Sequence, residues 1–146
     1  MRSLTFFSTA VKAMSRKELA ALCEECTSFD GHVGVTGMLL HRKGSFLQVL
    51  EGRSNVVSDM MVRIESDPRH KDLRIICDRV VAGREFDGPL GFEDLDALPE
   101  DTPFLNSFDY NIFAADPELA HQALVFFFHM RQRPVDGGNS SQAAYA

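Results

Sequence analysis

The chain has 146 residues, of which 45% are hydrophobic and 25% charged, and its 15 basic and 21 acidic residues give a formal net charge of -6 at pH 7. This size and composition predict one soluble domain with a core of its own, and the lack of a basic stripe argues against a nucleic-acid partner. The amino terminus has no signal-peptide pattern, and the longest apolar run (123–128) is too short to cross a bilayer, so we expect a cytoplasmic protein without membrane contact.

The first half of the chain alternates between strand and helix patterns. Residues 4–8 indicate a strand, and the capping-box sequence Ser15-Arg-Lys-Glu18 begins a helix that we expect to end before Gly31. Residues 33–41 are almost continuously apolar, as in an interior strand, and a short turn leads to a further strand at 45–52. These two strands should form an antiparallel hairpin.

The middle of the chain repeats this order. A second amphipathic helix, ending near Ser66, is indicated by apolar residues at i, i+3, i+4 and i+7, namely Val57, Met60, Met61 and Ile64. Residues 67–70 close this helix, 73–81 indicate a fourth strand, and 90–92 a weaker fifth. The resulting order βαββαβ predicts an α+β fold, the ferredoxin-like split βαβ, with both helices on one face of the sheet.

The last third of the chain changes in character. We expect a first domain at residues 1–97, then an extension at 98–133 that consists of a loop and a helix begun by Asp116 and Pro117. Its apolar residues surround more of the helix than a single buried stripe would. One alternative is that one face packs on the sheet and another on a partner protein, such as a second copy in a homodimer through 117–133. The other alternative is a helix that is simply wedged between the sheet and the loop. Residues 134–146 are expected to be disordered.

The cysteines and histidines do not form a recognisable reactive site. Cys23 and Cys26 give a C-x-x-C that lies inside the predicted helix, whereas redox motifs place the first cysteine at a helix N-terminus. A zinc site would need two more ligands, and only His32 is near. With no nucleophile–base pair and no phosphate loop, we expect packed thiols, no metal site, no catalytic residues and no enzymatic activity.

Gln48 is the most informative residue, because strand alternation puts its amide on one face with Phe46 and Leu50. A carboxamide on an apolar face is unfavourable unless something bonds it. Either the protein's own backbone or water satisfies Gln48, or the amide is directed at a ligand with a polar edge.

The motifs Val35-Thr-Gly37, Phe46-Leu-Gln-Val-Leu-Glu-Gly52, Arg63-Ile64 and Asp67-Pro-Arg-His70, in this order and spacing, resemble the BLUF family of blue-light sensors that use FAD. The resemblance covers about residues 3–93. It implies a flavin between the two helices, bonded by Gln48, with polar contacts from four further residues, Arg63, Asp67, Arg69 and His70. From the residues alone, Arg63 and Asp67 could be an ordinary i, i+4 ion pair of a helix. Arg69 and His70 could be solvated residues beyond the helix end, where basic side chains are favourable.

The chain departs from the family pattern at three places. Phe6 stands where the resemblance implies a tyrosine that donates an electron and a proton, and Phe29-Asp30 stand where it implies two asparagines. Phenylalanine has no O–H, and an ionised aspartate can only accept a hydrogen bond. After Phe86 the usual tryptophan and methionine are missing, so we expect the strand that relays the signal to be shortened or reworked.

These departures favour a degenerate signal-transduction module with weakened or lost FAD binding, insensitive to light, that acts through an unknown protein partner. The alternative is an FAD-binding photoreceptor with altered photochemistry. Because Phe6 and Phe29 replace polar groups with apolar bulk, we expect a smaller, more apolar pocket between the helices, in which Gln48 is bonded to backbone, water or Asp30.

Overall fold

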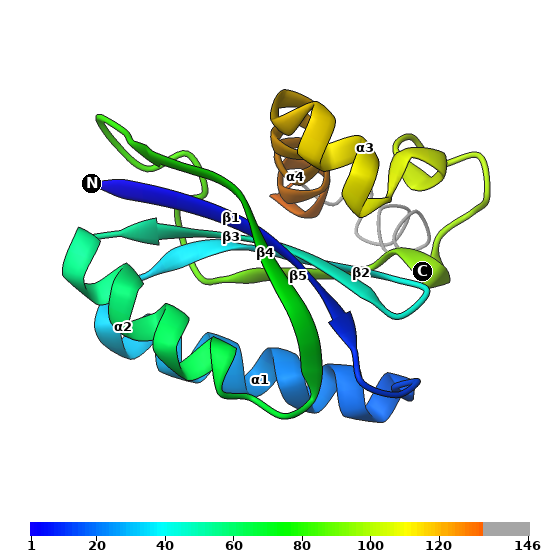
Figure 1. The fold of residues 1–146 in the computed structure, drawn as a ribbon, viewed down its shortest axis with the longest axis horizontal. Coiled ribbons are helices and arrows are strands. Elements are labelled where there is room, and N and C mark those ends of the chain that lie inside the picture. The colour runs from blue at the N-terminus through cyan, green and yellow to red at the C-terminus, as the bar shows by residue number, and fades with distance from the viewer. Residues whose placement is uncertain (133–146) are drawn as a thin grey trace, which may run out of the picture.

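A five-stranded sheet runs through the middle of the molecule, with helices on both faces (Figure 1). The computed structural model describes residues 1–132, apart from the side chains of residues 23, 26–33 and 132. The strands are β1 (Arg2–Ala10), β2 (Thr36–Arg42), β3 (Ser45–Gly52), β4 (His70–Val80) and β5 (Gly91–Asp94), in the spatial order β4-β1-β3-β2-β5. Neighbouring strands are antiparallel except for β2 and β5, which are parallel.

The helices form two layers. Figure 1 shows α1 (Arg16–Val33) and α2 (Ser54–Glu65) on one face of the sheet, and α3 (Tyr110–Ala115) and α4 (Pro117–Gln132) on the other. The ferredoxin-like split βαβ with a fifth strand and a C-terminal helix, predicted from the sequence, is therefore confirmed. The segment at 134–146, expected to be disordered, lies outside the described residues.

The central strands β1, β2 and β3 are buried on both faces because helices cover both sides of the sheet. Along β1, Leu4 and Phe6 pack against α2, whereas Phe7 packs into the layer of α3 and α4. Along β3, Leu50 faces the first layer and Leu47 the second. This two-sided burial explains the near-continuous apolar runs of the central strands.

Two local predictions are confirmed at the level of single bonds. The capping box is formed at the start of α1, where the Glu18 N–H donates to the Ser15 hydroxyl (3.1 Å) and the Ser15 N–H donates to the Glu18 carboxylate (2.9 Å). The β2–β3 hairpin turns through Lys43 and Gly44, both with positive φ (46° and 78°), as a two-residue hairpin loop requires.

Several bounds differ from the expectation: β1 begins at Arg2 rather than at residue 4, and β4 begins at His70 rather than at residue 73. Helix α1 continues through Gly31 to Val33 and ends at Gly34, which has a φ of 77° and thus serves as the C-terminal stop. Strand β2 accordingly begins at Thr36 rather than at residue 33. The stretch before Asp116, expected to be a loop, contains the short helix α3, whose N–H groups at Asn111 and Ile112 are capped by the Asp109 carboxylate.

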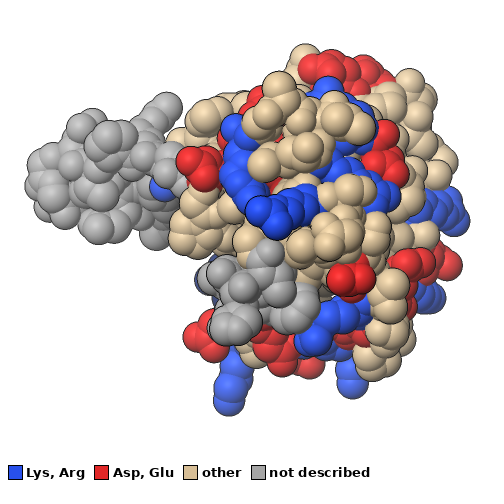
Figure 2. Space-filling view, turned by 90° about the vertical axis from the view of Figure 1, so that its left-hand side faces the viewer, with Lys and Arg blue, Asp and Glu red and all other residues tan. Residues whose placement is uncertain are grey.

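The end of the sheet where β1 begins and β3 ends carries both signs of charge. Figure 2 shows a short arc of Lys and Arg side chains there, with Asp and Glu side chains around it. Arg2, the first residue of β1, is bound by both carboxylate oxygens of Asp78 on the neighbouring strand (2.9 and 2.8 Å). No helix among the described residues is long and apolar enough to cross a membrane.

Candidate functional site

A cavity of about 50 Å³ lies between α1, α2 and the sheet. Its walls are mostly apolar and come from both helices and the three strands β1, β2 and β3, with a polar end at the turn that joins α2 to β4. The lining residues are Phe6, Ser8, Leu22, Leu39, Phe46, Gln48, Ile64, Asp67, Arg69 and His70. The structure thus brings four of the predicted site residues, Gln48, Asp67, Arg69 and His70, and one substituted position, Phe6, to one cavity.

Gln48 carries a buried, unpaired donor. Its side chain is 4% exposed, and its Nε2 has no hydrogen-bond partner among the described residues. The expected partners are backbone, water or Asp30; the backbone does not bond Nε2, and the Asp30 side chain lies outside those that the structure describes. A buried N–H group without a partner is destabilising, so this atom marks a place for a hydrogen-bond acceptor.

Phe6 lies directly opposite Gln48 in the register of β1 and β3. Its ring is 1% exposed and forms part of the cavity wall. The other cross-strand neighbour of Gln48 is Leu39 of β2, so both neighbours are hydrocarbon side chains, which can neither donate nor accept a hydrogen bond.

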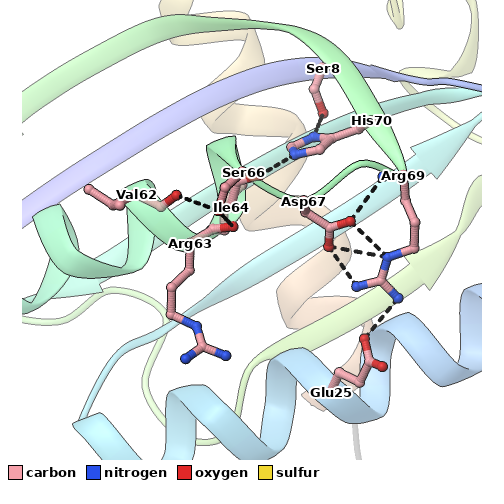
Figure 3. Close-up of polar contacts among 9 residues, drawn as sticks. All are labelled: Ser8, Glu25, Val62, Arg63, Ile64, Ser66, Asp67, Arg69 and His70. Atoms are coloured by element: carbon pink, nitrogen blue, oxygen red, sulfur yellow. Dashed lines mark hydrogen bonds and ion pairs between the residues drawn. The ribbon is translucent and has the colours of Figure 1, made fainter.

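The turn after α2 is fixed by an arginine that binds two carboxylates (Figure 3). The Arg69 Nε and Nη2 atoms donate to Asp67 (2.9 and 2.6 Å), and Nη1 pairs with Glu25 of α1 at 2.8 Å. The Arg69 side chain lowers the pKa of the Asp67 carboxyl, chiefly through these hydrogen bonds, and Asp67 in turn raises the pKa of the guanidinium. Both groups are charged at neutral pH.

Asp67 is thus paired with Arg69, two positions further along the chain. The i, i+4 helix ion pair between Arg63 and Asp67 is not what holds this carboxylate. Arg63 points from α2 toward α1 in Figure 3, while Arg69 occupies both oxygens of Asp67. Arg69 lies beyond the end of α2 with its side chain 40% exposed, and its guanidinium joins the turn to α1.

His70 is oriented by two hydrogen bonds. Its Nε2 contacts the Ile64 carbonyl oxygen, and its Nδ1 lies 2.9 Å from the Ser8 hydroxyl. Because a carbonyl only accepts, Nε2 carries the proton, and in the neutral ring Nδ1 accepts from Ser8. Ser8 and Glu25 are site residues that the sequence analysis missed. Ser8 follows Phe6 by two positions on the same strand face, and Glu25 follows Leu22 by three on α1, so both periodicities point to them.

Several predicted positions lie outside the described side chains. Phe29 and Asp30 belong to the last turns of α1, and their side chains, like those of Cys23, Cys26 and His32, are not described. Their interpretation, and the expected size and polarity of the pocket on this side, stay predictions.

Tyr110 is the one tyrosine among the described residues, but it lies away from the cavity. It begins α3 on the opposite face of the sheet, where its ring lies 5.9 Å from that of Phe7 and 4.5 Å from the Arg74 guanidinium carbon. The sheet therefore separates Tyr110 from the cavity.

The fold also assembles a polar cluster that the sequence spacing did not indicate. His41 of β2 lies 3.0 Å from Asp94 and 3.8 Å from Asp96, and the three side chains could reach one metal ion. Their oxygens are already engaged, because Asp96 accepts the Lys43 N–H and Asp94 accepts the Asp96 N–H. The cluster is thus explained as the link between the hairpin turn and the segment after β5.

The connection from β4 to β5, where the third departure falls, is pinned to the sheet. The buried Glu51 carboxylate accepts the N–H groups of Glu85 and Phe86 at 2.9 and 2.8 Å, and Arg84 donates to the carbonyls of Gly34 and Glu51. The strand that follows has only the four residues Gly91–Asp94.

The donor set of the cavity fits a flavin ring. A flat heterocycle with carbonyl and ring-nitrogen acceptors suits apolar walls, an unpaired amide N–H at Gln48, and a cationic donor at Arg69. Gln48 and Arg69 are the residues that would hold its polar edge, while His70, whose two ring nitrogens already bond Ser8 and Ile64, would border it. The space between these side chains measures about 50 Å³.

Comparisons with known proteins point in the same direction. The family model described as "BLUF: Sensors of blue-light using FAD" matches residues 1–89. The photoactivated adenylate cyclase subunit beta of Euglena gracilis is 38% identical over 76 residues, which are 52% of this chain and 9% of that protein. The corresponding subunit alpha is 33% identical over 88 residues, again 9% of its length, so the chain spans about a tenth of these curated relatives.

Solved structures agree in fold. The dark-state structure of BlrB, a BLUF protein, has a TM-score of 0.66 at 18% identity and covers 90% of this chain and 96% of its own. Klebsiella pneumoniae BlrP1 with FMN and cyclic diGMP has a TM-score of 0.63 at 26% identity, covering 80% of this chain and 36% of its own.

Proposed function

The chain belongs to the BLUF family of blue-light sensors that use FAD, and we propose that it is a regulatory domain of that family that binds flavin weakly and does not respond to light. The observation that carries the proposal is the pair formed by Phe6 and Gln48. An unpaired amide N–H faces a flavin-compatible cavity, but the residue opposite it is a phenylalanine.

The retained residues support binding. A bound flavin would supply blue-light absorption and an electron-accepting ring. The Gln48 N–H would gain the acceptor that it lacks, and Arg69 offers a cation beside it. A hydrogen bond that satisfies a buried donor is worth about 1 to 3 kcal/mol relative to leaving the donor unpaired. Set against this gain are the small cavity and the replacement of an asparagine by Asp30.

The substituted position supports loss of the light response. By family resemblance, that response depends on a phenol on the first strand that delivers an electron and a proton through the glutamine. The Phe6 ring has no proton to deliver, and among the described residues the one tyrosine, Tyr110, lies on the far face of the sheet. The chain has no tryptophan.

A visible absorption spectrum tests the proposal. The protein is purified with FAD supplied, and spectra are recorded before and after blue light. We expect a substoichiometric flavin band with no reversible red shift. A reversible red shift would contradict the proposal and would favour the alternative, a photoreceptor with an electron donor other than Phe6.

The output of such a module is protein contact, and we propose that α4 provides it within the cytoplasm. Its buried side, which includes Ala123 and Leu124, packs on the sheet, while Phe126 remains 36% exposed beside Phe104. A homodimer through 117–133 would cover the exposed side of α4, which carries Phe126. Size-exclusion chromatography with light scattering should show a dimer that Phe126→Ala converts to a monomer. A monomeric wild-type protein would contradict the homodimer and would point to a different protein as the partner of α4.

A further inference from the structure

A groove of about 270 Å³ lies beside the cavity, with Arg69 in the wall of both. It is open, mostly apolar, and formed by the β1–α1 connection, the start of α1 and the turn at Pro68. Its lining residues are Val11, Lys12, Met14, Glu18, Ala21, Pro68 and Arg69. Arg69 is the residue that the two hollows share.

Helix α1 forms one wall of both hollows. Glu18 and Ala21 line the groove, Leu22 lines the cavity, and Glu25, one turn further, binds Arg69. Residues at i, i+3, i+4 and i+7 occupy one face of a helix, so these four side chains form a single stripe that passes from one hollow to the other. The two hollows are therefore consecutive along α1.

Arg69 is held where the hollows meet by carboxylates from two elements. Asp67 holds it from the turn after α2, and Glu25 holds it from α1 (Figure 3). The Glu25 side chain is 62% exposed and that of Arg69 is 40% exposed. An ion pair this exposed contributes little to stability, so a ligand can displace Glu25 readily.

We propose that the cavity and the groove are one ligand site divided by Arg69, and that Glu25 controls how easily the two parts join. The inference rests on the proposed flavin binding and adds to it where the ligand's tail lies and which residue limits entry. The cavity takes a planar ring with a polar edge, and the groove takes a tail attached to that ring.

The charges of the groove select the tail. Lys12 and Arg69 are its cations, and its one acid, Glu18, accepts the Ser15 N–H in the capping box, which lowers the pKa of its carboxyl. A phosphate-bearing tail in the groove would therefore lie near the cations of Lys12 and Arg69. The one carboxylate of the groove, Glu18, is bonded to the N–H of Ser15 at the start of α1. The site should prefer FMN to riboflavin, because only FMN carries a phosphate for Lys12.

The role of Glu25 is tested with Glu25→Ala and the matched control Glu24→Ala. Both changes remove one negative charge from α1, and Ala is favourable in a helix interior, but Glu24 lines a different hollow with Phe92 and Asp94. We expect Glu25→Ala to bind riboflavin about two- to fivefold more tightly than wild type, and Glu24→Ala to match wild type. Riboflavin is uncharged, so charge repulsion does not explain a difference. Equal affinities in the two variants would overturn the role of Glu25 and leave flavin binding intact.

A second readout needs no ligand. In the unliganded protein, hydrogen exchange of the Arg69 Nε–H, followed by NMR, should be at least about twofold faster in Glu25→Ala than in Glu24→Ala, because Arg69 loses its tie to α1. Unchanged exchange would show that Glu25 does not hold Arg69. If no flavin binds to any variant, the proposed function fails and the ligand site with it, whatever the exchange shows.

The groove is tested with Lys12→Gln and the control Lys17→Gln, an equally exposed lysine outside the groove lining. We expect Lys12→Gln to reduce the ratio of FMN to riboflavin affinity about two- to fivefold, and Lys17→Gln to leave it unchanged. An equal ratio in both variants would show that the tail does not lie in the groove.

Discussion

Phe6 and Gln48 face each other across β1 and β3, both buried, and both form the wall of the cavity between α1 and α2. The amide N–H of Gln48 has no partner among the described residues, and the residue opposite it offers only carbon atoms. A single phenolic oxygen at position 6 would supply both an acceptor for this N–H and a proton donor for the site.

We therefore predict that Phe6→Tyr together with Asp30→Asn creates a reversible red shift on blue illumination. The tyrosine restores the O–H beside Gln48, and the asparagine restores an amide where an ionised carboxylate would repel a carbonyl oxygen. The measurement is the visible difference spectrum of the flavin-loaded protein, before and after light. Absence of a shift in a variant that binds flavin stoichiometrically would show that the site is blocked elsewhere.

Phe7→Tyr is the matched control for this change. Phe7 is the next residue on β1, but its ring lies on the other face, in contact with Phe113 and Phe108. The added hydroxyl is the same, so Phe7→Tyr combined with Asp30→Asn should give no red shift.

Gln48→Leu should stabilise the ligand-free protein and weaken flavin binding. The change replaces a buried amide that has an unpaired N–H by a similar apolar side chain, and removing such a donor is favourable by about 1 kcal/mol. Urea unfolding monitored by circular dichroism measures the gain. A loss of stability would instead mean that the amide is bonded in solution, through a water molecule or another group.

The local features of this fold were predictable from the sequence because local residues cause them. The capping box at Ser15 and the positive φ at Lys43 and Gly44 follow from side chains within a few positions. Helix α3 was missed because its six residues are too few to show a helical period of apolar residues. Its capping residue, Asp109, also lies within a Pro- and Phe-rich stretch that resembles a loop. Strand β4 was predicted, but Val80 is 86% exposed, since apolar alternation does not reveal that a strand lies at the edge.

The sequence indicated several residues that line the cavity, but not the ion pairs that they form. The resemblance placed Gln48, Asp67 and Arg69 together, as the cavity does. Which carboxylates Arg69 binds depends on where α1 crosses the turn after α2, so Glu25 enters the site through tertiary packing alone. Of the three partners expected for Gln48, the backbone does not bond its Nε2.

The Glu51 carboxylate should be a major stabilising group of the β4–β5 connection. It is 1% exposed and accepts two N–H groups, so Glu51→Ala leaves both unpaired and should lower the free energy of unfolding by about 2 to 4 kcal/mol. The control is Glu85→Ala, which removes a 2.8 Å contact between a half-exposed carboxylate and His121 and should cost less than about 1 kcal/mol. Similar losses for both variants in chemical denaturation would contradict this assignment.

Glu93 should make the protein less stable as the pH rises. Burial raises the pKa of its carboxyl above the usual 4.5, although the nearby Arg131 acts in the opposite direction. The folded state therefore holds the proton more tightly than the unfolded state does, so the contribution of this group is most favourable below 4.5 and is lost as the pH rises through the folded pKa. Glu93→Gln removes this dependence and should raise the stability at pH 7 by less than about 1 kcal/mol.

Thermal unfolding between pH 4 and pH 8 measures this effect as the difference between wild type and variant at each pH. The difference should be near zero at the acidic end and should grow toward neutrality, because only there must the wild type bury an ionised carboxyl. The control Glu100→Gln changes an exposed residue and should give a flat difference. A destabilised Glu93→Gln at pH 7 would show that attraction to Arg131 outweighs the burial of the charge.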